Sequence, residues 1–375
     1  MQLNQLSLDN SHWRKTLDDI SVLPNVVLLF VSPLFIDKKG LVKEIKKRFP
    51  ETKIIGCSTA GEISGVKVLD STASLTAIEF EKTSYKLVTV DVKDMNDSFN
   101  SGEALAEQLK ADDLNHVLVF SDGLNVNGAD LVNGLRKVLP KTIITGGLAG
   151  DDSRFENTFV IADDAISDKM IVGLGLYGEA LKIGYSSKGG WDSFGIDRLV
   201  TKSEKNVLYE LDGLPALELY KSYLGDNAKN LPSSGLLFPL SMRVNEHDKP
   251  VVRTILAIDE KSQSLTFAGN IPEGSYVRLM KANVDRLIDG AEGSAKKALK
   301  EAQVNAELAL LISCVGRRFV LKQLVEEEVE AVQEILGSET KLCGFYSFGE
   351  IAPFSKFSPC ELHNQTMTIT TFSEC

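Results

Sequence analysis

The sequence has few of the residues that build disulfide frameworks and metal sites. Its 375 residues include five cysteines and four histidines. The cysteines are odd in number, scattered and without a C-x-x-C pair, so they predict neither a disulfide framework nor a zinc site. Such cysteine usage is typical of a reducing compartment, and we expect a cytoplasmic protein.

Long apolar segments and an excess of positive charge are also missing. No segment approaches the roughly 18 apolar residues of a membrane span, and the start, MQLNQLSLDNSHWRKTLDD, has no apolar signal-peptide core. The formal net charge is −11, whereas nucleic acids and anionic membranes attract clustered Lys and Arg. We therefore expect no secretion signal, no membrane partner and no nucleic-acid partner.

The apolar content is sufficient for two domains. A length of 375 residues with 43% hydrophobic residues predicts two cores of ordinary size. The character of the sequence changes near 190–200. Residues 207–225, VLYELDGLPALELYKSYLG, have an apolar stripe at helical spacing, and the polar stretch GDNAKNLPSSG follows. A domain boundary is predicted in this region.

One pattern of elements occurs three times. An apolar strand, a loop, an amphipathic helix and a second strand lead into a Gly-rich turn, with a period of about thirty residues. The turns are GCSTAGEI at 56–63, GGLAGDD at 146–152 and GFYSFGEI at 344–351. Apolar strands joined through a helix are typical of parallel crossover units. We expect the three turns to line one edge or to meet in one cleft.

Other segments favour antiparallel pairing. Residues 72–80 and 85–92 are strands separated by a short polar turn, 159–178 alternates around a polar bend as a hairpin does, and 251–282 holds three strands in meander order. The predicted fold is therefore mixed α/β in two domains, with repeated strand-helix-strand crossover units and antiparallel hairpins.

Two acids and one arginine are the first candidates for a binding site. Glu62 and Glu350 stand at matching positions of two turns, where a carboxylate accepts a hydrogen bond from an amino group or holds an arginine. Arg253, in VVRTIL, stands among apolar residues and needs a partner because an unpaired buried charge is costly. Two alternatives stay open for Arg253: a structural Arg–Glu pair at a domain seam, or a fork that grips a ligand carboxylate.

The segment GRR at 316–318 follows a strand and opens a helix, so Arg317 and Arg318 suit a carboxylate or propionate, with a solvated arginine pair as the alternative. Cys57 becomes a nucleophile only if the fold brings a base beside it. No Ser-His-Asp set and no Walker loop is present, and GLGLYG at 173–178 lacks the helix that follows a nucleotide loop. We therefore predict that the protein is not an enzyme.

An aromatic turn close to a histidine suggests a pocket. Tyr346, Phe348 and Glu350 alternate along one stretch, and His363 follows within a dozen or so residues, so Tyr346, Glu350 and His363 are expected to face one cavity. The alternative is that His363 hydrogen-bonds to the returning turn. His247, in NEHDKP, is the second histidine candidate. The expected aromatic walls are Phe345, Tyr346, Phe348, Phe354 and Phe357.

Ten segments occur in an order that resembles the FIST sensory proteins, an N-terminal FIST domain followed by a FIST C domain. They are GCSTAGEI, GGLAGDD, GLGLYG, LDGLPALELY, FPL, VVRTIL, IPEGSYVRL, CVGRRFVL, GFYSFGEIAP and LHNQTMTIT. The resemblance implies a FIST N-terminal domain over 25–195, a FIST C domain over 196–372, and small-molecule sensing for bacterial signalling, with amino acids proposed as ligands. Similar stand-alone members bind haem and sense nitric oxide, which implies haem b with His363 or His247 as axial ligand. A separate histidine kinase or cyclic-di-GMP enzyme is the implied partner.

The sequence thus predicts a cytoplasmic sensor with one small-ligand pocket, built mainly by the C-terminal domain with the repeated turns on its rim. Haem for nitric oxide sensing is the first expectation, and an amino acid or other small carboxylate without haem is the alternative. An enzyme that uses Cys57 is the least favoured alternative. A monomer and a homodimer both stay open. The expected ligand-binding residues are Arg253, Tyr346, Glu350, His363, Arg317, Cys57 and Glu62.

Overall fold

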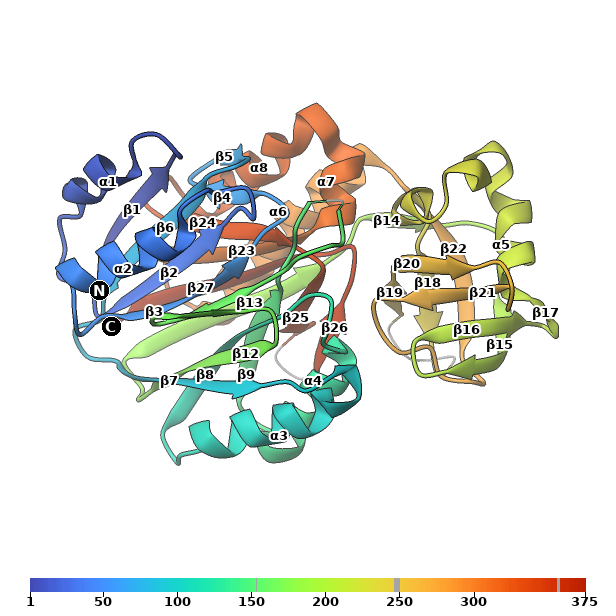
Figure 1. The fold of residues 1–375 in the computed structure, drawn as a ribbon, viewed down its shortest axis with the longest axis horizontal. Helices are drawn as coiled ribbons and strands as arrows, with labels where there is room; N and C mark the ends of the chain where they lie inside the picture. The colour runs from blue at the N-terminus through green and yellow to red at the C-terminus, as the bar shows by residue number, and fades with distance from the viewer. Residues whose placement is uncertain (153, 246–249, 356–357) are drawn as a thin grey trace.

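The computed structural model describes residues 1–152, 154–245, 250–355 and 358–375 (Figure 1). Two residues of the sequence analysis, His247 and Phe357, lie outside these ranges. Among the described helices, none combines the length and the apolar character that a membrane crossing requires.

The main body consists of three copies of the same succession: strand, helix, strand, helix, strand, two-stranded hairpin and strand. The first copy contains β1 (Gln2–Leu8), α1 (Trp13–Thr16), β2 (Val26–Val31), α2 (Lys38–Arg48), β3 (Lys53–Ser58), β4 (Glu62–Ser64), β5 (Lys67–Leu69) and β6 (Ala73–Glu79). The second contains β7 (Ser84–Asp91), α3 (Ser98–Leu109), β8 (Leu114–Ser121), α4 (Gly128–Val138), β9 (Ile143–Leu148), β10 (Val160–Ala162), β11 (Ala165–Ser167) and β12 (Met170–Tyr177). The third contains β13 (Leu181–Lys188), α6 (Val284–Ala302), β23 (Leu308–Cys314), α7 (Val315–Leu321), α8 (Val325–Leu336), β24 (Lys341–Ser347), β25 (Gly349–Pro353), β26 (Cys360–His363) and β27 (Met367–Glu374).

The central part of each copy is a parallel crossover unit. Strands β2 and β3, β8 and β9, and β23 and β24 are parallel neighbours joined through α2, α4 and α7–α8. Their residues are apolar and almost all buried, because such pairs are covered on both faces. The predicted crossover units and the mixed α/β class are confirmed. The whole copy is longer than the predicted period, since the first one extends from Gln2 to Glu79.

The hairpin of each copy leaves its own sheet and joins the sheet of another copy. The pair β4–β5 joins the third sheet, β10–β11 the first and β25–β26 the second. The three six-stranded sheets have the strand orders β1-β6-β2-β3-β10-β11, β7-β12-β8-β9-β25-β26 and β13-β27-β23-β24-β4-β5. Because this exchange is cyclic, each copy needs the other two to complete its sheet.

The cyclic exchange corrects two of the predicted antiparallel pairings. Strands β6 and β7, predicted as neighbours across a short turn, lie in different sheets, where β6 pairs with β1 and β2, and β7 with β12. In 159–178 the hairpin consists of β10 and β11 alone, whereas β12 belongs to another sheet. The alternating pattern predicted the strands but not their partners, which come from distant parts of the chain.

The three Gly-rich turns meet at the centre of the body and hydrogen-bond to one another in a ring. Each turn donates one backbone N–H to a carbonyl oxygen of the next. The contacts are Ala60 N to Tyr346 O at 2.8 Å, Phe348 N to Leu148 O at 3.3 Å, and Gly150 N to Ser58 O at 3.0 Å. The turns therefore meet, as expected, but they form a buried junction between the copies.

The first glycine of each turn lies where a side chain has no room. A Cβ added at Gly56, Gly146 or Gly344 would lie 1.8 Å from a carbonyl oxygen of the adjacent parallel strand, that of Leu29, Val119 or Leu311 respectively. Gly146 and Gly344 also have φ of 154° and 155°, which side chains disfavour. The glycine recurs because the same close strand contact recurs in each copy.

Aromatic side chains fill the space between the sheets. The ring centroids of Phe30 and Phe120 are 5.5 Å apart, and Phe345 lies 4.8 Å from Phe30 and 5.7 Å from Phe120. Each copy contributes one of these rings, and all three are buried. The helix pairs α1–α2, α3–α4 and α6–α8 lie outside the sheets (Figure 1). Phe345 is thus a core residue, not the pocket wall that the sequence suggested.

A second domain is inserted into the third copy, between β13 and α6 (Figure 1). It contains β14 (Trp191–Ser193), β15 (Arg198–Glu204), β16 (Val207–Leu211), β17 (Leu214–Pro215), α5 (Ala216–Leu224), β18 (Leu240–Arg243), β19 (Val251–Arg253), β20 (Ile255–Asp259), β21 (Ser264–Phe267) and β22 (Tyr276–Ala282). Its path of strands is β19-β18-β22-β15-β16-β21-β20. The core of this domain is separate from those of the body.

The inserted domain differs from the sequence prediction in two places. The predicted helix over 207–225 is confined to α5, because its first part forms β16 and β17. The predicted meander over 251–282 ends after one antiparallel pair, β20 with β21, since β22 pairs with β15 and β18.

The predicted boundary at 195/196 falls just after β14, where the chain has entered the inserted domain. The chain then returns to the body at α6.

Candidate ligand-binding cleft

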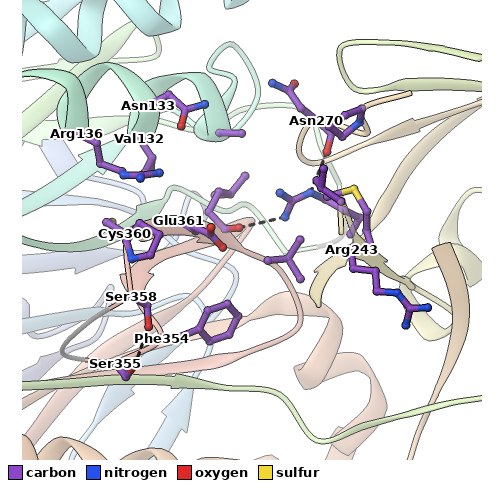
Figure 2. Close-up of a pocket in the computed structure, with 18 residues that line it drawn as sticks. Val132, Asn133, Arg136, Arg243, Asn270, Phe354, Ser355, Ser358, Cys360 and Glu361 are labelled. Atoms are coloured by element: carbon purple, nitrogen blue, oxygen red, sulfur yellow. Dashed lines mark hydrogen bonds between the residues drawn. The ribbon is translucent and has the colours of Figure 1, made fainter. Parts of the chain in front are cut away.

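A cleft of about 690 Å³ lies at the seam between the inserted domain and the body (Figure 2). The body contributes α4 and residues 354–355 and 358–362, and the inserted domain contributes β18, β19 and the loop around Asn270. Small-ligand sites of this size commonly lie between domains. Among the described residues, none of the three central turns lines this cleft, so the turns do not form its rim.

Arg253 lines the cleft from β19 and is buried. Its guanidinium donates to three main-chain carbonyl oxygens: Nε to Asn270 O at 3.2 Å, and Nη1 to Val252 O at 3.3 Å and Leu362 O at 3.1 Å. Within the described ranges, no carboxylate forms an ion pair with Arg253, and Nη2 donates to no residue. The structural Arg–Glu pair considered from the sequence is therefore absent from the described part of the seam.

The charge on Arg253 is buried among main-chain carbonyls, and Glu361 lines the same cleft. Burial lowers the pKa of Arg253 to about 10, an effect that the negative charge of Glu361 opposes, so the guanidinium is a cation at neutral pH. Its hydrogen-bond acceptors are neutral carbonyls. A buried cation with neutral acceptors is stabilised further by an anion that enters the cleft.

Two more arginines reach the cleft, and Figure 2 distinguishes them. Arg136 extends from α4 toward the seam near Val132. The guanidinium of Arg243 points away from Arg136 and from Cys360, and its Nη2 donates to Asp197 at 2.6 Å. Arg136 is therefore the second cation of the cleft, whereas Arg243 contributes mainly its apolar stem.

Strand β26 presents its free edge to the cleft. It is the last strand of its sheet and pairs only with β25 there. The Leu362 carbonyl accepts from Arg253 across the seam, so the main-chain groups of Cys360 and Leu362 face the inserted domain. An edge strand offers unpaired N–H and C=O groups, which suit a polar ligand.

Asn270 links the inserted domain to the start of α4. Its Oδ1 accepts from Asn127 Nδ2 at 2.8 Å, and its Nδ2 donates to Asp130 Oδ1 at 2.8 Å. Asn127 also caps α4, because its side chain accepts from the N–H groups of Ala129 and Asp130. The orientation of the inserted domain therefore depends on hydrogen bonds at one end of the cleft.

Glu62 and Glu350 occupy equivalent positions, as their matching turns suggested, but outside the cleft. Both are buried and hydrogen-bonded within their own copies. The contacts are Glu62 with Thr59 Oγ1 and with Thr72 N and Oγ1, and Glu350 with Ser347 Oγ and with Thr366 N and Oγ1. Burial raises the pKa of Glu62 to about 7 and that of Glu350 to about 8. These carboxyl groups hold the turns in place and have no free face for a ligand.

Arg317 and Tyr346 belong to a buried network around Glu328. Arg317 Nη2 lies 2.6 Å from Glu328 Oε2, and Tyr346 Oη donates to Glu328 Oε1 at 2.6 Å. Arg317 also donates to the carbonyl oxygens of Gly189 and Leu287. The anion that the sequence placed at Arg317 is thus a side chain of the protein.

Arg318 and Cys57 have structural environments as well. Arg318 donates to Ala60 O at 2.6 Å and forms ion pairs with Asp70 and Asp152, so it covers the ring of turns. Cys57 lies in β3 in the core, and burial raises the pKa of its thiol well above the ordinary value. A protonated core thiol is a poor nucleophile.

Glu350 and His363 stand opposite each other in the β25–β26 pair, but Tyr346, Glu350 and His363 have separate hydrogen-bond partners. His363 is buried, its Nε2 is hydrogen-bonded to Ala352 O at 2.8 Å, and its ring lies edge-on to Phe354 at 4.2 Å between centroids. This is the alternative in which His363 bonds to the returning turn. Burial lowers the pKa of His363 to about 4, so it is neutral at neutral pH.

A haem held by His363 does not fit this arrangement, since Nε2 is engaged and the ring is enclosed. Among the described lining residues of the cleft, the side chains that resemble known iron ligands are Met242 and Cys360. The Cys360 thiol donates to Ile144 O, and burial raises its pKa. The second histidine candidate, His247, lies outside the described residues.

Arg136 and Asn270 were not selected from the sequence. Arg136 stands in the last turn of an amphipathic helix. A basic residue is common there because it interacts favourably with the helix dipole, so its presence does not indicate a binding site. Asn270 stands in a loop without a motif. Arg253 was selected because a charge in an apolar strand is unusual, and this signal led to the cleft.

Three repeated crossover units and an inserted domain define a two-domain α/β protein with a cleft of small-ligand size at the domain seam. Residues 25–214 match the FIST N domain model, and residues 216–353 match the FIST C domain model. The chain therefore belongs to the FIST family, whose domains are sensory domains of signalling proteins.

Curated relatives are distant. An uncharacterized protein of Methanocaldococcus jannaschii is 27% identical over 332 residues, which cover 82% of this chain and 63% of that protein. An uncharacterized protein of Mycobacterium tuberculosis is 24% identical over 257 residues, which cover 64% of each chain. The match thus spans less than two thirds of either relative. A solved cyanuric acid hydrolase from A. caulinodans aligns over 99% of this chain and 98% of the hydrolase chain. The sequence identity is 8% and the TM-score is 0.36.

Proposed function

We propose that this FIST protein senses a small carboxylate, such as an amino acid, in the cleft between its inserted domain and its body. One observation carries the proposal: Arg253 is a buried cation on the cleft wall, and its acceptors among the described residues are neutral carbonyls. Nη2, which donates to no described residue, is available for a ligand oxygen. Guanidinium groups bind carboxylates through charge-assisted hydrogen bonds of this kind.

The ligand acts by changing how the inserted domain is held. Arg253 already bonds to Leu362 O of the body, and Asn270 bonds to Asn127 and Asp130 at the start of α4. An anion between Arg253 and Arg136 adds a bridge between the same two parts. Ligand binding then shifts the population of domain orientations in proportion to its preference for one of them.

The output passes to a separate signalling protein, a histidine kinase or a cyclic-di-GMP enzyme. The support is the family, whose domains are sensory, together with the resemblance to members that regulate such enzymes. Kinase autophosphorylation with and without this protein, measured at several carboxylate concentrations, tests the link. A rate that this protein never alters at any concentration argues against a kinase partner.

Haem for nitric oxide sensing is the second candidate. Its support is the family resemblance and the apolar cleft wall of Val132, Met242 and Phe354, beside arginines that suit propionates. Haem binding requires an iron ligand other than His363, because His363 Nε2 is hydrogen-bonded to Ala352 O. A Soret band in protein from haem-replete cells, shifted by nitric oxide, would place haem ahead of a carboxylate.

Calorimetric titration of the full chain with free amino acids and simple carboxylates tests the primary proposal. Arg253→Lys keeps the charge but loses the fork, and we expect it to weaken binding by about tenfold, which is about 1.4 kcal/mol. Arg278→Lys is the matched control, because Arg278 belongs to the same domain and pairs with Asp197 outside the cleft. Equal affinities of wild type and Arg253→Lys, or a chain that binds none of these compounds, would contradict the proposal.

A further inference from the structure

The cleft continues beyond α4 into a second hollow. Five residues line both spaces: Asn133, Arg136, Ser358, Pro359 and Cys360. The second hollow, here called the basic groove, has a volume of about 810 Å³ and includes Lys137, Lys141, Tyr185 and Pro353 in its lining. All of its described lining residues belong to the body. The two hollows are therefore neighbouring compartments that meet at Arg136.

The charge of the basic groove is opposite to that of the chain. Its described lining residues include Arg136, Lys137 and Lys141 and no carboxylate, although the chain carries 52 acidic residues and a net charge of −11. Lys137 is paired, with its Nζ at 2.6 Å from Glu103 Oε1. The side chains of Arg136 and Lys141 form no ion pair or hydrogen bond with another described residue. The described lining of the groove thus supplies no carboxylate for these two cations, and Glu361 lines the adjoining cleft.

Helix structure alone does not explain this arrangement. Arg136 and Lys137 stand in the last turn of α4, where cations favour the helix dipole. Lys141 follows the helix, next to the start of β9, and has no such role. Arg136 extends toward the seam, so its guanidinium lies at the junction of the two hollows (Figure 2).

We propose that the ligand has two anionic groups, one on Arg253 in the cleft and one on Arg136 and Lys141 in the basic groove. The ligand class is an elongated dicarboxylate or a compound with the same two terminal anions. This inference rests on the proposed function, because it extends the carboxylate site of Arg253. Both hollows lie within the size range of small-ligand sites, and their shared residues allow one molecule to occupy both.

The test is calorimetric titration of the full chain with straight-chain dicarboxylates from succinate to sebacate and with the monocarboxylates of the same lengths. We expect dicarboxylates of one length to bind about tenfold more tightly than the matching monocarboxylate. The variant Lys141→Gln should remove most of this advantage and change monocarboxylate affinity by less than about twofold, because Lys141 lines the basic groove and not the cleft. Lys47→Gln is the control, since Lys47 stands in the last turn of α2, the counterpart of α4, and is exposed.

The outcomes separate this inference from the proposed function. Dicarboxylates that bind no more tightly than monocarboxylates at any length would overturn the inference and leave the carboxylate site of Arg253 intact. A Lys141→Gln variant that weakens both series equally would also overturn it, because Lys141 would then not act on a second anion. If Arg253→Lys binds monocarboxylates as well as wild type, the proposed function fails instead. A chain that binds neither series contradicts both.

Discussion

The two buried carboxyl groups of the central turns should make the stability of the body depend on pH. Burial raises the pKa of Glu62 from 4.5 to about 7 and that of Glu350 from 4.5 to about 8, with Asp70 adding to the rise at Glu62. The folded chain therefore keeps two protons that the unfolded chain releases near pH 4.5. Between these values the folded state binds more protons, so the free energy of unfolding decreases as pH rises.

The magnitude follows from the two pKa values. At about 1.36 kcal/mol for each pKa unit, ionisation costs up to about 3 kcal/mol at Glu62 and about 5 kcal/mol at Glu350. These contributions are fully present below about pH 4.5 and are lost as pH passes about 7 and then about 8. Their sum is comparable to the whole stability of an ordinary domain, which is about 5–15 kcal/mol.

The perturbation is Glu350→Gln, alone and with Glu62→Gln. Glutamine has the shape and neutrality of the protonated acid: its carbonyl accepts from Thr366 as Oε2 does, and its amide donates to the Ser347 hydroxyl. Urea unfolding from about pH 5 to about pH 9 should then show a smaller decrease in the free energy of unfolding than in wild type. Glu334→Gln, an exposed change on α8, is the control for loss of charge.

Two results would refute this reasoning. The first is a pH slope that is the same in wild type and in the double variant. The second is a Glu350→Gln protein that is more than about 2 kcal/mol less stable than wild type at pH 5, because the two side chains should then be equivalent.

Three further predictions concern other parts of the fold. Glu328→Gln leaves Arg317 buried without its counter-charge and should lower the free energy of unfolding by about 3–5 kcal/mol, measured by urea unfolding against an exposed Glu variant. Gly344→Ala places a Cβ 1.8 Å from Leu311 O and should cost ~3 kcal/mol or more, seen as a lower melting temperature or as insoluble protein. Asn270→Ala removes two hydrogen bonds at the seam, worth about 1–3 kcal/mol together, and should increase hydrogen exchange at the start of α4 while the body core stays protected.

The elements of the body could be predicted because their patterns are strong and local. Continuous apolar strands such as Val26–Val31 and Leu308–Cys314, with an amphipathic segment between each and its partner, have few alternative interpretations. Strand partners could not be predicted in the same way. The strand Glu62–Ser64 pairs with residues 343–345, nearly three hundred positions away, and nothing in its own sequence specifies that neighbour.

Of the residues at the candidate site, the sequence identified those whose local pattern is unusual and missed contacts between distant segments. Arg253 was identified because its charge conflicts with its apolar strand. Tyr346 and Glu350 were placed in one cavity by strand alternation, but alternation gives only the face of a sheet. Their actual partners are Glu328 on α8 and Thr366 beyond β26, two separate networks that local sequence does not reveal.

The cleft exists because the threefold plan of the body is broken at one place. The cyclic exchange puts the hairpin of one copy beside the second helix of another, so three equivalent sites arise, at α4 with β25–β26, at α2 with β10–β11, and at α8 with β4–β5. At α8 the space is closed, because Glu326 accepts from Lys67 Nζ and Val68 N. At α2 a hollow of about 550 Å³ remains beside Lys39 and Lys43.

The α4 site alone is covered by the inserted domain, which brings Arg253 over it. The α2 hollow has a similar origin and two lysines, but no described residue of the inserted domain lines it. Positive charge next to a hairpin is therefore not sufficient for the proposed site. What distinguishes the cleft is a buried guanidinium supplied from a second domain, the part that the proposed function requires to change position when an anion binds. The insertion that interrupts the third copy thus gives one of three equivalent sites the guanidinium on which the proposed carboxylate site depends.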